Sequence, residues 1–477
     1  MKINEIIASW KPVKRWVTLI SFLLSFSTLA LLIWVISLPR NMQLFKWSPP
    51  QRQIFIIVCI VAAIVPLGFV FDFIFRMKKN VISKKIPGKY VYALVLIGII
   101  LPSAYLIYLS PYHHVGDKAP ELMIIDQPGV SGYPNLAVMF YTQKATTEFI
   151  NYGTSMSDMD TQVLDSNPIH SHVFVLKDLN PGIQYFYQIN GEGKIYNFTY
   201  FPASTNDLKF GISSDVHIGA EDCNLTAVTG ILEQMVNPTN SYNAFFCLGD
   251  IVDMGNDDSM YQEQIELFSP YTTAIPFRNM IGNHDGWFGG VEFWKDYFYP
   301  VNAPSNSSDS QLWHQYDFGP NIHVFNLDLE WGIESYTEAQ KVWFEEKLQA
   351  LDPDDWIIVM NHAYYYASST EYDGIPWYDN PDMINTFQPL FKQYGVDLVF
   401  AGHDHQMEHI AQDGVDYFIV GAMGGYRDKD PTFYSENSQF FDNTHFGFAD
   451  VQFNGVNVTV SFRTPENTLL YNVTINQ

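Results

Sequence analysis

Cysteine and cationic side chains are both scarce in this sequence. Its 477 residues include three cysteines, too few for a disulfide scaffold, and Cys247 lies in an apolar run that disfavours a disulfide with Cys223. The 26 Lys and Arg are outnumbered by 51 Asp and Glu, a formal charge of −25, which argues against binding nucleic acid. Hydrophobic residues make up 47% of the chain, which argues against disorder. Its length predicts roughly two to four folded domains.

The few cations are concentrated at the amino-terminal end. Residues 1–110 hold 13 basic and 2 acidic residues, a net charge of +11, whereas the remainder holds 13 basic and 49 acidic residues, a net charge of −36. The basic part contains three apolar runs, each long enough to cross about 30 Å of hydrocarbon as a helix. We expect residues 1–112 to be a membrane anchor with transmembrane helices at about 16–38, 53–75 and 90–110. A cleaved signal peptide is the alternative for the first run, disfavoured by its length and by the two runs that follow.

The flanking charges predict the orientation of this anchor. The amino terminus and the loop after the second run carry ten Lys and Arg, against three in the loop between the first and second runs. The positive-inside rule therefore predicts a multi-pass membrane protein with a cytoplasmic amino terminus and an extracellular or lumenal carboxyl-terminal part. Five Asn-x-Ser/Thr sequons lie in that outer part, which predicts a glycoprotein. They are at Asn197, Asn224, Asn306, Asn457 and Asn472.

Short strand patterns follow the anchor. Alternating apolar residues at 136–141, 172–176 and 184–189 are separated by turns rich in Gly, Pro and Asn, a pattern typical of a β-sandwich. Residues 176–187 resemble the corner of fibronectin type III-like domains, in particular the domain that precedes the catalytic domain of purple acid phosphatases. We therefore expect a fibronectin III-like β-sandwich over residues 113–205.

Residues 206–477 contain the residues suited to metal chemistry. Five apolar runs end in Asp, Asn or His, and helical patterns such as 338–348 lie between them, as parallel crossovers require. Ligands of such sheets collect beyond the carboxyl ends of the strands. Asp oxygen and neutral imidazole suit Zn, Mn and Fe, and one carboxylate can bridge two cations. The residues at these ends are Asp215, His217, Asp250, Asp253, Asn283, His284, His362, His403 and His405.

In order, these motifs (Asp-x-His, Gly-Asp-x-x-Asp, Gly-Asn-His-Asp, His and Gly-His-x-His) resemble those of the calcineurin-like metallophosphoesterases over about 208–465. With the preceding β domain, the chain is most similar to purple acid phosphatases. The resemblance implies an α/β catalytic domain of αββα type over 206–477, with two divalent metal ions. It implies a first metal held by Asp215, His217, Asp250 and His405. It implies a second metal held by Asp250, Asn283, His362 and His403, so that Asp250 bridges the two.

Two further positions complete the comparison with the family. His284 matches the histidine that contacts the phosphate and protonates the leaving alkoxide. Asp253 stands where purple acid phosphatases have the tyrosine that binds Fe(III), so we expect a colourless enzyme with Mn, Zn or Fe(II). Asp253 is expected either to bind metal or to orient His217 or His405. The glycines at 249, 282 and 402 are expected to permit sharp turns.

The function predicted from the sequence is a membrane-anchored, extracytoplasmic phosphoesterase that hydrolyses phosphomonoesters by attack of a metal-bridging hydroxide. A phosphodiesterase or pyrophosphatase acting on lipid or polyprenyl head groups is the alternative, because the same site serves both ester classes. A non-catalytic adhesion or sensor protein is a third possibility, disfavoured by the complete set of ligands. Several aromatic residues after the motifs form either a substrate rim or part of the core. They are Trp287, Phe288, Trp331, Trp377 and Tyr378.

Overall fold

The computed structural model describes residues 120–129, 132–300, 303, 311–372 and 374–477. These residues all belong to one compact unit that spans 113–477. The predicted membrane anchor, residues 1–112, and the sequon at Asn306 lie outside the described residues. Within the described ranges, no helix combines the length and the apolar character that crossing a bilayer requires.

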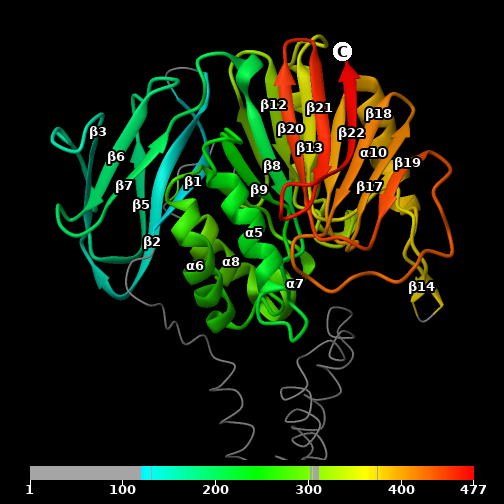
Figure 1. Ribbon diagram of the computed structural model, residues 1–477, viewed down its shortest axis with the longest axis horizontal. Coiled ribbons are helices and arrows are strands. Elements are labelled where there is room, and N and C mark those ends of the chain that lie inside the picture. Colours follow the sequence, from blue (N-terminus) through cyan, green and yellow to red (C-terminus); the bar gives the residue numbers. More distant parts are fainter. Residues whose placement is uncertain (1–119, 130–131, 301–302, 304–310, 373) are drawn as a thin grey trace, which may run out of the picture. The chain divides into compact units, whose positions relative to one another are not determined.

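A nine-stranded sheet forms one layer (Figure 1). Four neighbouring strands, β8, β9, β10 and β1, run parallel, and β20 pairs with β8 in the antiparallel sense. In spatial order the strands are β22 (Leu469–Asn476), β21 (Asn457–Arg463), β20 (Phe448–Asn454), β8 (Lys209–Ser213), β9 (Ala244–Cys247), β10 (Phe277–Asn279), β1 (Glu121–Pro128), β2 (Pro134–Thr146) and β5 (Ile169–Leu176).

A seven-stranded sheet forms the second layer. Its centre is parallel, because β12, β13, β16 and β18 pair in that sense, while β11, β17 and β19 complete the sheet in the antiparallel sense. In spatial order the strands are β11 (His314–Asp317), β12 (Ile322–Asn326), β13 (Trp356–Met360), β16 (Leu398–Ala401), β18 (Val415–Val420), β17 (Met407–Gln412) and β19 (Ser438–Asp442). A small hairpin, β14 (Glu371–Tyr372) and β15 (Ile375–Pro376), lies apart from both sheets.

The hydrophobic core lies between the two sheets, and helices cover their outer faces. Phe210 and Phe246 of the first sheet belong to the same buried cluster as Ile358 and Phe400 of the second. Figure 1 shows α5 (Leu225–Val236), α6 (Asp258–Thr272) and α8 (Gly290–Phe298) on the first sheet. A second cluster joins α9 (Glu338–Gln349) and α10 (Pro381–Tyr394) to the outer face of the second sheet. A one-turn helix, α7 (Asn283–Gly286), follows β10.

The buried faces and the ends of the helices follow from the sequence. The buried positions of α5 recur at the 3.6-residue period, and they are Ala227, Val228, Ile231, Leu232 and Met235. Side chains cap the helix starts: Asn224 accepts a hydrogen bond from the backbone of α5, and Thr337 accepts one from α9. Gly395 ends α10 with a left-handed backbone.

The region before the catalytic sheets is rich in strands, as predicted. Strands β1, β2 and β5 belong to the nine-stranded sheet, and a separate four-stranded sheet packs its aromatic residues into the same core. That sheet contains β4 (Thr161–Leu164), β3 (Phe149–Gly153), β6 (Gln184–Ile189) and β7 (Ile195–Thr199). Because β1 pairs directly with β10, the two regions share one continuous sheet, and the boundary at 205 stays a prediction.

Candidate metal centre

Five strand ends bring the predicted residues together. Strands β8, β9 and β10 of the first sheet lead into the first three motifs, and β13 and β16 of the second sheet lead into the last two. Because the strands are parallel within each sheet, their carboxyl ends meet at a common edge. The seven predicted ligands therefore come from both layers although they are spread over nearly 200 positions of the chain.

The first group consists of Asp215, His217 and His405, all buried. Nε2 of His217 lies 3.1 Å from Nε2 of His405, and Nε2 of His405 lies 3.3 Å from Oδ1 of Asp215. That oxygen is buried and has no hydrogen-bond partner among the described residues. A buried carboxylate oxygen without a partner destabilises the folded state. A cation bound by this oxygen and the two imidazole nitrogens would remove that cost.

The second group consists of Asp250, Asn283, His362 and His403. Oδ1 of Asn283 lies 2.7 Å from Nδ1 of His403 and 3.0 Å from Nε2 of His362. Nε2 of His362 also lies 3.3 Å from Oδ2 of Asp250. Carboxylate oxygen, amide oxygen and two imidazole nitrogens thus converge on one point, a donor set that suits Zn, Mn or Fe.

Asp250 is a member of the second group and also lies beside His217 of the first. Its Oδ2 lies 3.6 Å from Nε2 of His217 in the first group and 3.3 Å from Nε2 of His362 in the second. Its other oxygen, Oδ1, accepts a 2.7 Å hydrogen bond from the backbone nitrogen of His284. Asp250 therefore lies where the resemblance places the bridging ligand, and the residues present fit a dinuclear centre.

Hydrogen bonds on the far side of the imidazoles fix their orientation. Nδ1 of His405 donates to the carbonyl oxygen of Tyr426 over 2.6 Å, and Nδ1 of His362 donates to the carbonyl oxygen of Leu248 over 2.8 Å. These acceptors assign the proton of each ring to Nδ1, which leaves the lone pair of Nε2 directed at the centre. Both rings are thereby held in the tautomer that can bind a metal.

Four of the predicted ligands have a left-handed backbone. The φ angles are 62° at Asp215, 55° at His217, 49° at Asp250 and 72° at His403. Such angles are uncommon outside glycine and each carries a strain of about 1–3 kcal/mol, which the surrounding structure must offset. Their concentration at the metal-binding residues is typical of a functional site whose geometry takes precedence over local stability.

Two of the three glycines have a different role from the one expected. Only Gly249 has a positive φ, of 102°, and a Cβ there would lie 2.6 Å from the backbone nitrogen of Gly282. At Gly282 itself a Cβ would lie 2.3 Å from Oδ1 of Asp250, and at Gly402 it would lie 2.6 Å from Oδ2 of Asp215. Gly282 and Gly402 are therefore needed for close approach to the ligands rather than for their own backbone angles.

Electrostatics at the centre favour positive charge. Burial alone would raise the pKa of Asp215 and of Asp250, but attraction to His362 and to the other imidazoles outweighs it and holds both pKa values below their usual range. Burial alone would lower the pKa of His217, yet the nearby carboxylates of Asp215 and Asp253 raise that pKa to about 10. The two ionised carboxylates thus favour a protonated imidazole beside them, and they would favour a bound metal ion at the same place for the same reason.

Asp253 and His284 lie together beside the first group. Nδ1 of His284 donates to the carbonyl oxygen of Asp253 over 2.8 Å. The carboxylate oxygen Oδ1 of Asp253 lies 3.5 Å from Nδ1 of His284 and 3.5 Å from Nδ1 of His217. The carboxylate therefore faces the outer side of His217, which favours the orienting role over direct metal binding. His405 has the carbonyl of Tyr426 as its partner instead.

The sequence reasoning gave no role to Asp285 or to the Gly-Gly-Tyr segment at 424–426. Asp285 is fully buried and accepts hydrogen bonds from the backbone nitrogens of Ile251, Val252 and Gly282, so it ties together the two loops that carry Asp250 and Asn283. Its pKa is raised to about 8 by burial and by the nearby Asp250. The 424–426 segment supplies the carbonyl oxygen that holds His405, and it follows β18, a parallel neighbour of β16. Its position after an apolar run, like that of the ligand motifs, is the sequence feature that could have indicated a role at the centre.

Aromatic rings surround the accessible side of the centre. Among the seven predicted ligands only His403 is partly exposed, and the ring of Trp377 stacks on it at 5.1 Å between centroids. Trp331 contacts the same imidazole at 5.2 Å, and Trp287 packs against His284 at 3.8 Å. Three of the aromatic residues singled out in the sequence, all tryptophans, thus lie against histidines of the centre. Tyr378 stacks on Phe433 instead, and Phe288 lies edge-to-face with Trp287 at 6.3 Å between centroids.

Comparison with known proteins agrees with this geometry. A family model described as calcineurin-like phosphoesterase matches residues 208–407. Acid phosphatase type 7 of Mus musculus is 23% identical over 329 residues, which cover 63% of this chain and 72% of that protein. Purple acid phosphatase 18 of Arabidopsis thaliana is 22% identical over 318 residues, which cover 62% and 68%.

Among solved structures, a purple acid phosphatase from yellow lupin (Lupinus luteus) seeds is similar to this chain with a TM-score of 0.62 and 18% identity, covering 75% of this chain and 74% of that one. At that identity the similarity concerns the fold. The chain therefore contains a calcineurin-like metallophosphoesterase domain and has purple acid phosphatase homologues. Together these findings support a phosphate-ester hydrolase, as the sequence predicted.

Proposed function

We propose that this chain is a membrane-anchored phosphoesterase that hydrolyses phosphomonoesters outside the cytoplasm. The observation that carries the catalytic part is the place of Asp250, whose Oδ2 lies within 3.6 Å of a histidine from each of the two ligand groups. A structural metal site needs no such shared carboxylate, whereas a pair of cations acting on one phosphate does. Phosphate release from an aryl monoester by the purified chain, with loss of release on chelation, is the test.

Two divalent cations at these residues would activate water and neutralise the oxygens of a bound phosphate. Asp215, His217 and His405 would hold one of them, and Asn283, His362 and His403 the other, with Asp250 shared. The protein itself supplies the rigid positions: six of these seven side chains are buried, and carbonyl oxygens fix two of the imidazoles, those of His362 and His405.

His284 supplies the proton to the leaving oxygen. Because its Nδ1 donates to the carbonyl of Asp253, its Nε2 faces the centre, 3.9 Å from Oδ2 of Asp250. Burial lowers the pKa of His284 below its ordinary value, so Nε2 carries a proton only in the imidazolium form, at acidic pH. Proton transfer from Nε2 to the leaving oxygen leaves the neutral ring, and we expect this step to need acidic pH. Asp253 keeps the ring in this orientation.

The membrane anchor and the outer location of the catalytic domain rest on the sequence. The three apolar runs, the +11 charge of residues 1–110 and the sequons in the acidic part support them. Protease protection in sealed vesicles tests the orientation: the catalytic domain should be cut from the outside of intact cells or from the lumenal side of organelles. A catalytic domain that resists protease until the cytoplasmic face is exposed contradicts it.

A phosphodiesterase or pyrophosphatase acting on lipid head groups is the second candidate. The observation in its favour is the aromatic side of the centre, where Trp331 and Trp377 flank His403 and could contact a large leaving group. Turnover of an aryl monoester, the matching aryl diester and a phospholipid in vesicles separates the candidates. Faster turnover of the diester or the lipid than of the monoester would replace the first proposal with the second.

A further inference from the structure

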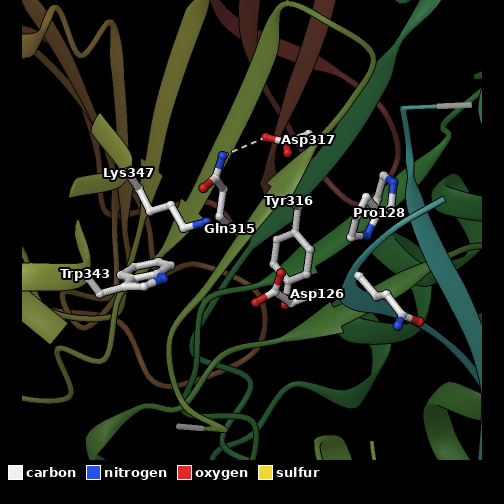
Figure 2. Close-up of a pocket in the computed structure, with 9 residues that line it drawn as sticks. Asp126, Pro128, Gln315, Tyr316, Asp317, Trp343 and Lys347 are labelled. Carbon is white, nitrogen blue, oxygen red and sulfur yellow. Dashed lines mark hydrogen bonds between the residues drawn. The ribbon is translucent and has the colours of Figure 1, made fainter. Parts of the chain in front are cut away.

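A cavity of about 200 Å³ lies beside strand β11 and helix α9, and it shares no residue with the candidate metal centre. Figure 2 shows a hydrogen bond within its lining, from Gln315 to Asp317. Because none of its lining residues is a predicted ligand or one of the aromatic residues around the centre, this cavity makes no contact with a phosphate ester bound at the metals. The leaving group of such an ester is therefore contacted by residues that surround the centre itself.

Four aromatic rings form a continuous row from the predicted proton donor to the hairpin β14–β15. Trp287 packs against His284 at 3.8 Å between ring centroids, and Trp331 stacks on Trp287 at 6.3 Å. Trp377 meets Trp331 edge-to-face at 6.4 Å, and Tyr372 meets Trp377 in the same way at 5.5 Å. We call Trp287, Trp331, Trp377 and Tyr372 the aromatic row.

The two central rings of the aromatic row lie against the metal ligand that solvent can reach. Trp331 and Trp377 contact the imidazole of His403, at 5.2 and 5.1 Å between centroids, and His403 is partly exposed. The two indoles are themselves partly exposed, whereas Trp287 is 6% exposed. A molecule bound at the metals can therefore contact the two central indoles, and Trp287 links them to His284.

Hydrogen bonds hold the aromatic row in place. The backbone nitrogen of Trp377 donates to the carbonyl oxygen of Thr370 over 3.1 Å. The hydroxyl of Tyr372 donates to Oδ1 of Asp428 over 3.3 Å, and Oδ2 of the same carboxylate accepts a 2.6 Å hydrogen bond from the backbone nitrogen of His405. The hairpin is thereby tied to the loop that carries a ligand of the first group. Rings held in this way lose little conformational entropy when a substrate binds.

The aromatic row lies on the side where the leaving group departs. Under the proposed function, on which this inference rests, Nε2 of His284 protonates the leaving oxygen. The first ring of the row, Trp287, packs against that imidazole, and Trp331 follows it. The atoms attached to the leaving oxygen therefore come next to Trp331 and Trp377, while the phosphate oxygens face the two ligand groups.

Charges around the aromatic row restrict the chemistry of the leaving group. The carboxylate of Asp428 lies at one end, on the hydroxyl of Tyr372. The carboxylate of Glu330 lies at the other end, where a Cβ on Gly286 would come within 2.2 Å of its Oε2. Lys429, whose Nζ lies 4.8 Å from the centroid of the Tyr372 ring, offsets one of these charges. A leaving group with negative charge of its own is therefore disfavoured.

We propose that Trp331 and Trp377 select phosphomonoesters whose leaving group contains an uncharged, planar aromatic ring. Stacked or edge-to-face contact between aromatic rings strengthens binding about 2–10-fold beyond the effect of the buried area. A saturated ring of the same size buries as much surface but lacks this contribution. A cationic group would be attracted to the indole faces but repelled by Lys429, which already lies over the row.

The test compares three monoesters whose leaving alcohols have similar acidity: phenethyl phosphate, cyclohexylethyl phosphate and ethyl phosphate. With the full chain and divalent metal, we expect kcat/KM for the phenethyl ester to exceed that for the cyclohexylethyl ester about threefold or more. Equal values, or a higher value for the cyclohexylethyl ester, overturn this inference and leave the proposed function standing. A higher value for choline phosphate than for the phenethyl ester also overturns it, in favour of a cation site. Hydrolysis of none of the esters contradicts the proposed function.

Binding of phosphonate analogues judges the inference without turnover. Phenethylphosphonate and cyclohexylethylphosphonate have a P–C bond in place of the scissile P–O bond, so they bind without being cleaved. Quenching of tryptophan fluorescence in the full chain with metal should show the phenethyl compound binding about threefold tighter or more. Equal affinities, or no binding of either compound at about 10 mM, overturn the inference whether or not the esters are hydrolysed.

Two single variants assign the preference to the aromatic row. Trp331→Leu and Trp377→Leu keep an apolar side chain but remove the ring, so each should lower kcat/KM for phenethyl phosphate about fivefold or more and leave that for ethyl phosphate within about twofold. Tyr394→Leu, a partly buried aromatic position at the end of α10, is the matched control and should change neither value. An equal loss for both esters would show that the indoles act only by supporting His403, and it overturns the proposal.

Discussion

The backbone nitrogen of His284 donates a 2.7 Å hydrogen bond to Oδ1 of Asp250. This contact joins the predicted proton donor to the carboxylate shared by the two ligand groups, so each residue fixes the place of the other. Because Oδ1 is engaged in this way, Oδ2 is the oxygen left to face His217 and His362. The geometry for metal binding and the geometry for proton transfer are therefore coupled through one side chain.

Asp250→Asn tests the shared carboxylate. The amide keeps the size of the side chain and an oxygen for the backbone of His284, but it loses the charge that two cations need. We expect kcat to fall by more than the roughly 10–100-fold typical of an outer-sphere partner, with loss of bound metal. Asp450→Asn, a buried carboxylate that pairs with Lys209 and Arg463, is the matched control and should leave kcat per folded molecule unchanged.

The contact between Asp253 and His284 predicts that the losses of kcat caused by substituting each residue do not simply add. His284→Gln should lower kcat by about 10²–10⁴-fold while the metal content stays the same. Asp253→Asn should lower kcat less, because the backbone carbonyl of residue 253 still holds Nδ1 of His284. In the double variant the two losses should add only in part, because the effect of Asp253 on His284 disappears with that ring while its effect on His217 remains. Full additivity would show that Asp253 acts elsewhere, and a loss of metal in Asp253→Asn would favour its direct binding.

Gly249 predicts a stability difference between two glycine positions. Gly249→Ala requires a side chain at a φ of 102° and places a Cβ 2.6 Å from the backbone of Gly282, so we expect a loss of more than about 2 kcal/mol. Gly414→Ala has a similar φ, of 86°, but no atom within 4 Å, and should lose only about 1 kcal/mol. Denaturant unfolding of both variants measures the difference. Equal losses would mean that the contact with Gly282 is relieved by relaxation.

The buried carboxyl of Glu121 predicts a pH dependence of stability. Burial raises its pKa from 4.5 to about 7, although hydrogen bonds from Thr272 and Gln264 oppose the shift. The folded state therefore binds a proton more tightly than the unfolded state, and this contribution is complete below about pH 4.5 and is lost as the pH rises toward 7. Glu121→Gln should remove the dependence and stabilise the protein at pH 8, by on the order of 3 kcal/mol. A wild-type protein and a variant with parallel stability curves between pH 4.5 and 8 would contradict the shifted pKa.

Much of the catalytic domain could be predicted from the sequence because its ligands mark the ends of apolar strands. The pattern at 338–348 became α9, and the run ending at Asn361-His362 became β13. The resemblance to a known family then assigned the residues to two groups, and the structure brings those residues together as two groups that share Asp250.

Other features depend on contacts between distant residues and left no local pattern. The direct pairing of β1 with β10 joins two predicted domains in one sheet, and the carbonyl of Tyr426 reaches His405 from another strand end. The close approach at Gly282 likewise depends on Asp250, 32 positions earlier in the chain.

The most direct test of a dinuclear phosphoesterase is the metal content of the purified full chain, measured together with phosphate release from an aryl monoester. The account predicts about two divalent ions per chain, loss of both metal and activity on chelation, and recovery of activity when Mn, Zn or Fe(II) is restored. Full phosphate release by a chain stripped of metal, or by metal-free Asp250→Asn protein, would contradict it.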